Sequence, residues 1–124
     1  MDITALRQRV RDLDFRRRRL IEDALRPLPM VVGYLFQMAR RCGRSGCRCA
    51  KGRLHVSWYL SRRVGGKTKL SYLGRVIPEW LGLRVRRYRE YQNALASIRK
   101  IDREISDLLN KLREEETGTL EDGP

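Results

Sequence analysis

The sequence predicts an α+β protein in which two long helices flank a small β-hairpin module. Two stretches repeat apolar residues at alternating spacings of three and four, which is typical of coiled-coil helices with a narrow apolar seam. Between them, residues 56–64 alternate apolar and polar side chains and precede Gly65-Gly66, as in a hairpin with a two-residue turn. With 124 residues the chain is one small domain. Its predicted segments are 1–26, 27–77, 78–116 and 117–124.

The first helix is expected within residues 1–26. Asp2 is placed to cap the helix or complement its dipole, and Pro27 with Pro29 ends it. One charged residue, Arg17, interrupts an otherwise apolar seam. The seam consists of Ile3, Leu6, Val10, Leu13, Arg17, Leu20 and Ala24.

The last helix is expected over residues 78–116, with Pro78 in its first turn and Gly118 past its end. Its seam also carries one ionisable residue, Asp102, opposite in sign to Arg17, so an antiparallel pairing that sets these two residues together is expected. Residues 117–124 are predicted to form a disordered acidic tail. The seam consists of Leu81, Arg84, Tyr88, Tyr91, Leu95, Ile98, Asp102, Ile105, Leu109 and Leu112.

The hairpin between the helices has a register that follows from its turn. Two turn residues place Tyr59 beside Tyr72 on one face of the hairpin. On the other face the expected pairs are Val64 with Lys67, Arg62 with Lys69, Leu60 with Ser71, and Trp58 with Leu73. The apolar run at residues 31–39 fits either a third strand or a short helical turn, and the pattern does not decide between them.

Charge is distributed unevenly along this basic chain, whose formal net charge is +13. Residues 27–77 hold eleven Lys and Arg side chains and no Asp or Glu. Because like charges around a folded core repel unless a polyanion relieves them, this segment is expected to meet one. No uncharged stretch is long enough to span a bilayer, and the acidic start is unlike a secretion signal, so we expect a cytoplasmic protein without a membrane partner.

Three cysteines and the single histidine lie close together at the spacing Cys-x4-Cys-x-Cys-x5-His. An odd number of thiols in a reducing compartment argues against a disulfide scaffold. Four such ligands close a tetrahedral zinc site, and a small two-stranded module needs such a staple. Reduced spectator thiols and an iron–sulfur cluster are the alternatives. The predicted zinc ligands are Cys42, Cys47, Cys49 and His55, and the predicted fold is two coiled-coil-like helices flanking a zinc-stapled hairpin module.

The same loop resembles a family of short prokaryotic proteins known only as a domain of unknown function. The family pattern is a Cys-Gly-Lys-x-x-Cys-x-Cys-Ala-x-Gly loop, a His-Gly-Pro before an aromatic strand, and a Gly-Lys-Thr turn. The sequence departs from it at Arg44 and at Val56-Ser57. The resemblance implies no established activity. The matching residues are Cys42, Gly43, Cys47, Cys49, Ala50, Gly52, His55, Gly66, Lys67 and Thr68.

The function predicted from these observations is non-enzymatic nucleic-acid binding, with DNA favoured over RNA and a location at the nucleoid if DNA is bound. Arg and Lys contact phosphates but supply little sequence information. The alternative is a protein-interaction adaptor or nucleoprotein subunit whose helices dimerise or dock a partner. Catalysis is not expected, because residues 27–77 lack a carboxylate acid or base. The predicted contacts are Arg40, Arg41, Arg44, Arg48, Lys51, Arg53, Arg62, Arg63, Lys67, Lys69, Arg84 and Arg87.

Overall fold

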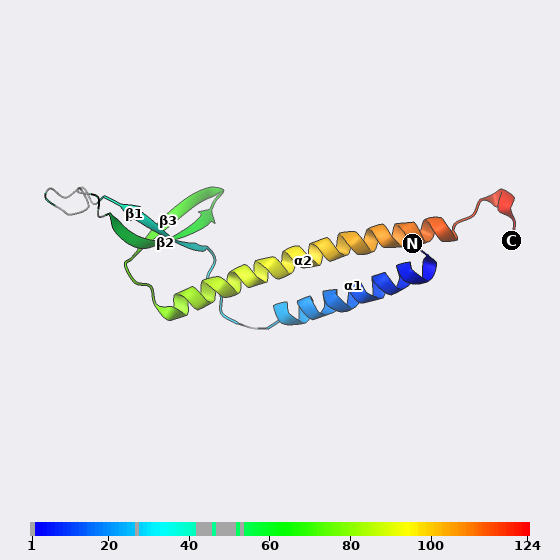
Figure 1. Ribbon diagram of the computed structural model, residues 1–124, viewed down its shortest axis with the longest axis horizontal. Coiled ribbons are helices and arrows are strands. Elements are labelled where there is room, and N and C mark those ends of the chain that lie inside the picture. Colours follow the sequence, from blue (N-terminus) through cyan, green and yellow to red (C-terminus); the bar gives the residue numbers. More distant parts are fainter. Residues whose placement is uncertain (1, 27, 42–45, 47–51, 53) are drawn as a thin grey trace. The chain divides into compact units, whose positions relative to one another are not determined.

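The computed structural model describes residues 2–26, 28–41, 46, 52 and 54–124. The predicted α+β class is confirmed, with two long helices and a three-stranded antiparallel sheet. Two compact units are present, a helical unit of Met1–Pro27 with Tyr91–Pro124 and a sheet unit of Leu28–Glu90. The elements in chain order are α1 (Ile3–Ala24), β1 (Tyr34–Arg40), β2 (His55–Val64), β3 (Lys67–Gly74), α2 (Glu79–Glu116) and a 3₁₀ helix at Leu120–Asp122 (Figure 1).

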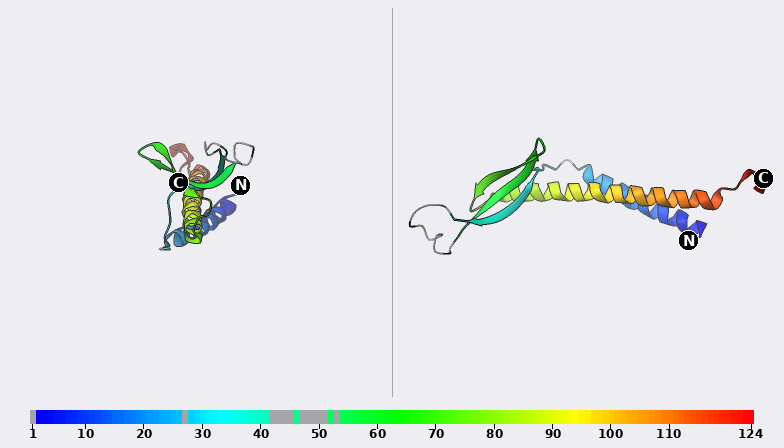
Figure 2. Two further views of the ribbon diagram at one scale, coloured as in Figure 1. Left: turned by 90° about the vertical axis from the view of Figure 1, so that its left-hand side faces the viewer. Right: turned by 90° about the horizontal axis from the view of Figure 1, so that it is seen from above.

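In the helical unit, α1 runs antiparallel to the C-terminal part of α2 (Figure 1, Figure 2). The predicted cap of α1 is confirmed, because the backbone N–H of Thr4 donates to Asp2 Oδ1 at 2.7 Å. Leu6 and Leu13, both in the predicted seam of α1, are buried. These two residues lie on the same face of α1, and the burial of their side chains stabilises the helical unit.

The predicted contact between the two helices is confirmed: Arg17 Nε donates to Asp102 Oδ1 at 2.6 Å. The seam predicted for α2 is wrong in detail. Ile101, outside that seam, is buried, whereas Leu109 within it is 48% exposed. An ideal helix turns once every 3.6 residues, so a strict three-four alternation drifts across its surface over ten turns and brings the neighbouring position inward.

In the sheet unit, the strands pair in the order β1-β2-β3. Most of the apolar run at residues 31–39, which fits either a strand or a helical turn, lies in strand β1, whose Leu35 pairs with Leu60 of β2. Gly65 and Gly66 form the hairpin turn with φ of 58° and 78°, as a primed turn requires. The register is confirmed for Val64–Lys67, Arg62–Lys69, Leu60–Ser71 and Tyr59–Tyr72.

One predicted pair of the hairpin is wrong, because Trp58 lies opposite Gly74 and not Leu73. An irregularity between Trp58 and Tyr59 shifts the register there. A bulge adds a residue on one strand without a change in the turn, so counting outward from the turn cannot detect it.

The core of the sheet unit lies between the sheet and the first turns of α2. Leu60 of β2 packs with Leu81 and Val85 of α2, and Val31, Leu35, Leu73 and Ile77 surround them. The backbone N–H of Val31 donates to the Arg84 carbonyl at 3.1 Å. Pro78 precedes α2 and does not occupy its first turn; its carbonyl accepts from the Leu81 N–H at 3.1 Å.

Gly33 allows β1 to approach β2 closely. Its φ is +139°, and an added Cβ would lie 2.7 Å from Leu60 Cδ1 and 2.9 Å from the Ser61 carbonyl. Any side chain here would therefore collide with the core and the neighbouring backbone. The acidic tail expected to be disordered contains the 3₁₀ helix, where the Thr119 N–H donates to Asp122 Oδ2 at 2.6 Å.

Candidate nucleic-acid interface

The tip of the β2–β3 hairpin gathers cations from two strands. Arg62 pairs with Lys69, and Val64 with Lys67, so three cations project from one face of the hairpin beyond the core. All three are exposed. In the part of the chain that the structure describes, they form no ion pair. We name Arg62, Lys67 and Lys69 the cationic tip.

Arg63, the fourth predicted contact at the hairpin end, has a different environment. It pairs with Thr68 and therefore projects from the opposite face of the hairpin. Its Nη2 donates to the Gly66 carbonyl at 2.7 Å. This hydrogen bond closes the turn, so Arg63 supports the shape of the tip and contributes charge to the other side.

The remaining described candidates lie elsewhere in the sheet unit. Arg40, at the end of β1, holds its guanidinium 5.4 Å from the centre of the Tyr59 ring, and Arg41 follows it on the surface. Arg84 and Arg87 of α2 are half-buried. The Arg84 guanidinium lies 5.1 Å from the Trp80 ring centre, and Arg87 Nη1 reaches the Pro29 carbonyl at 3.5 Å. These two arginines therefore pack within the unit.

The cysteine loop is the part of the prediction that the described residues leave untested. His55 is described: it begins β2 and lies opposite Arg40, the last residue of β1. Residues 41–54 thus connect two paired strand ends. Among the described side chains, no three His, Cys, Asp or Glu residues gather as metal ligands would. The predicted residues outside the described part are Cys42, Cys47, Cys49, Arg44, Arg48, Lys51 and Arg53.

A feature absent from the sequence prediction is a row of aromatic rings across the sheet. Tyr34 and Phe36 of β1 extend the predicted Tyr59–Tyr72 pair to four rings. The alternation Tyr-x-Phe was the available signal. This signal is informative only where the segment is a strand, as Tyr34–Arg40 is, because the apolar run at residues 31–39 also fits a helical turn.

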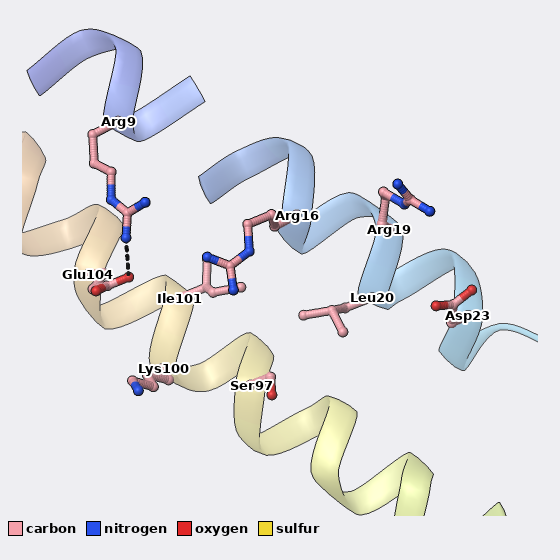
Figure 3. Close-up of a pocket in the computed structure, with 9 residues that line it drawn as sticks. All are labelled: Arg9, Arg16, Arg19, Leu20, Asp23, Ser97, Lys100, Ile101 and Glu104. Carbon is pink, nitrogen blue, oxygen red and sulfur yellow. Dashed lines mark ion pairs between the residues drawn. The ribbon is translucent and has the colours of Figure 1, made fainter. Parts of the chain in front are cut away.

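A hollow with a volume of about 580 Å³ lies between α1 and α2 in the helical unit (Figure 3). Arg16 and Leu20 of α1 extend toward α2, and Arg9 pairs with Glu104 at 3.8 Å. Cations here mix with acids, so part of the charge is neutralised within the unit. The lining residues are Arg9, Arg16, Arg19, Leu20, Asp23, Ser97, Lys100, Ile101 and Glu104.

Comparison with known protein families identifies the family of this chain. A family model described as a domain of unknown function (DUF6788) matches residues 7–82. The chain belongs to this family. The predicted resemblance to a domain of unknown function is thereby confirmed. The DUF6788 match includes most of α1, the whole sheet and the first turn of α2, but it ends before Asp102, the partner of Arg17. The cysteine pattern itself stays a prediction.

This DUF6788 member was also compared with curated proteins and with solved structures. No curated protein and no solved structure matches the chain. Across the residues that the structure describes, no helix has both the length and the apolar character needed to cross a membrane.

Proposed function

We propose that this protein binds nucleic acid, DNA in preference to RNA, through the cationic tip of its sheet unit. The observation that carries the proposal is the arrangement of Arg62, Lys67 and Lys69 on one face of a narrow hairpin, without an acid in residues 27–77. Arg and Lys side chains that contact phosphates release condensed counterions, and this release drives binding. A narrow projecting hairpin fits along a phosphate backbone or into a groove.

The test is the salt dependence of duplex binding. Each phosphate contact contributes about −0.9 to the slope of log K against log salt concentration on B-form DNA. The variant Arg62→Glu/Lys67→Glu/Lys69→Glu leaves Arg63 in place, so the bond that closes the turn is retained. We expect this variant to lose affinity for all duplex sequences about equally and to have a slope that is less negative by about 3. Unchanged affinity at physiological salt would remove the cationic tip from the interface.

We also propose that zinc holds the loop at residues 41–54 through Cys42, Cys47, Cys49 and His55. His55 stands at the mouth of this loop, opposite Arg40, and the loop supplies three thiols. Thiolates and imidazole are the ligands of structural zinc, whose binding contributes folding free energy. We expect about one zinc per chain by elemental analysis. His55→Ala should lower that content, and the control Val56→Thr, an exposed neighbour, should keep it. Equal zinc in both variants would contradict the proposal.

The alternative function, a helical adaptor, is less well supported. Leu6, Leu13 and Ile101 are buried within the helical unit of one chain, so their apolar surface is already covered. The ion pairs of that unit also join residues of the same chain. A partner of the helices would therefore have to bind their outer surfaces, which carry charges of both signs.

A further inference from the structure

The four aromatic rings of the sheet form one continuous row. Tyr34 and Phe36 are stacked with ring centres 6.1 Å apart, and Phe36 and Tyr59 with centres 5.8 Å apart. Tyr72 meets Tyr59 edge to face at 5.6 Å. The row crosses all three strands. We name these four residues the aromatic row.

The aromatic row projects from the face of the sheet opposite the core. Leu35, Leu60 and Leu73 belong to the core, and each is adjacent in its strand to a residue of the row. Successive side chains of a strand point to opposite faces. The two end rings are open to solvent, with Tyr34 55% and Tyr72 67% exposed. The four rings are contiguous, and a contiguous patch of exposed apolar surface marks a binding site more often than a single exposed ring does.

Cations surround the aromatic row. The Arg89 guanidinium of α2 lies 5.1 Å from the centre of the Tyr34 ring, and Arg40 lies 5.4 Å from that of Tyr59. Arg63 projects from the same face, near the tip. The strands contribute no carboxylate, because residues 27–77 contain none. Rings and guanidinium groups without acids complement a ligand that is both flat and negatively charged.

We propose that the aromatic row binds single-stranded DNA, with bases stacked on Tyr34 and Tyr72 and phosphates held by Arg40, Arg63 and Arg89. Single strands fit this surface because their bases are free to stack on protein rings, whereas the bases of a duplex are already stacked on one another. The duplex contact proposed for the cationic tip relies on charge and does not involve aromatic rings. The inference rests on the proposed nucleic-acid function and adds a second, strand-selective surface to it.

The experiment compares a 20-nucleotide oligothymidine and a 20-base-pair duplex by fluorescence anisotropy near physiological salt. Replacing Tyr34 and Tyr72 together by Thr removes both exposed rings and keeps residues that favour strands. We expect single-strand affinity to fall about 10- to 100-fold, the usual effect of losing stacked rings, and duplex affinity to change less than about threefold. Phe at both positions should retain the single-strand affinity within about threefold, because the rings remain.

Trp80 supplies the matched control. It is 52% exposed, also has an arginine guanidinium over its ring, and lies on α2 outside the row. Trp80→Leu should therefore leave single-strand affinity within about threefold of the parent. An equal loss in Trp80→Leu and in the double Thr variant would overturn the assignment of the row, because the effect would then belong to exposed rings in general.

The outcomes separate this inference from the proposed function. If the charge-reversed tip variant loses duplex binding while the double Thr variant keeps single-strand binding, the function stands and the aromatic row is wrong. If the parent binds neither strand nor duplex, both fail. An RNA strand of the same length should bind no more tightly than the DNA strand, since stacking does not read the sugar; a preference for RNA of more than about threefold would overturn the DNA assignment. Self-association abolished by the Thr substitutions, with single-strand affinity intact, would assign the row to a protein contact.

A second measurement uses the unaltered protein, so it does not depend on folding of the variants. A strand substituted with 5-iodouracil forms covalent cross-links to aromatic side chains on which its bases stack. Peptide mapping should find the cross-links at Tyr34 and Tyr72. Cross-links confined to residues outside the aromatic row would contradict the proposal.

Discussion

The helical unit and the sheet unit deal with their positive charge in opposite ways. In the helical unit Arg7, Arg9 and Arg17 each meet a carboxylate of α2, at 3.3, 3.8 and 2.6 Å. In the sheet unit Arg40 and Arg89 lie over tyrosine rings and Arg63 donates to a backbone carbonyl, and residues 27–77 contain no carboxylate. One unit neutralises its charge internally, and the other leaves it available to a polyanion. This difference is the reason why we propose that the sheet unit binds nucleic acid and that the helices give structural support.

The largest expected effect is on the helical unit. Leu13 is completely buried, so Leu13→Ala should lower the free energy of unfolding by about 2–5 kcal/mol through the lost apolar contacts and the remaining cavity. Chemical denaturation followed by circular dichroism measures this change. Phe15→Ala, at a position 62% exposed, is the control and should shift stability by less than about 0.5 kcal/mol. DNA affinity of the folded Leu13→Ala protein should match that of the parent; a large loss would show that the helices take part in binding.

The second largest expected effect is on the stability of the sheet unit. Gly33→Ala should lower the free energy of unfolding by about 2–4 kcal/mol, because its φ of +139° is unfavourable for alanine and the new Cβ meets Leu60 and Ser61. The same denaturation experiment detects it. Nucleic-acid binding should weaken as well, because β2 carries part of the cationic tip.

Gly82→Ala is the matched control for Gly33. Gly82 lies in α2, and an added Cβ would meet only Ile77 Cδ1, at 3.9 Å. We expect this variant to be more stable by about 0.5–1 kcal/mol, because alanine loses less conformational freedom in a helix than glycine. Equal destabilisation in both variants would mean that the tight approach of β1 to β2 is not what requires Gly33.

The smallest effect concerns the ion pair of the helical unit. The side chains of Arg17 and Asp102 are 37% and 49% exposed, so the coupling energy in a double-mutant cycle with Leu should be about 0.2–1 kcal/mol. The pair is expected to set the register of α1 against α2 more than to stabilise it. Unfolding free energies of the parent, the two single variants and the double variant, measured by thermal denaturation, give the coupling. Strict additivity would indicate that the contact does not form in solution.

Features set by local sequence or by one simple charge pairing were predictable. Asp2 caps α1, the Gly65-Gly66 turn sets most of the hairpin register, and seams of opposite charge place Arg17 beside Asp102. Each follows from residues close in the chain or from one simple pairing. Features that depend on tertiary geometry were not predictable. These include the shift of the strand register at Trp58 and the burial of Ile101.

The candidate site likewise has one part that was predictable from local sequence and one part that was not. The cations of the tip were predictable because the turn itself places Arg62 opposite Lys69. The aromatic row was not, because it needs β1 beside β2, and nothing local in residues 31–39 selects a strand over a helical turn. The need for Gly33 was hidden for the same reason, since its close neighbours Leu60 and Ser61 lie in another strand.

The most direct test of the comparison reverses three charges in each unit and measures duplex binding against salt. Arg62→Glu/Lys67→Glu/Lys69→Glu alters the cationic tip, and Arg11→Glu/Arg99→Glu/Arg103→Glu alters exposed positions of the helical unit. Both variants change the net charge equally, so general attraction to DNA falls by a similar amount in each. We predict that the slope of log K against log salt is less negative by about 3 for the tip variant and nearly unchanged for the helical one. Equal slopes in the two variants would contradict the assignment of binding to the sheet unit.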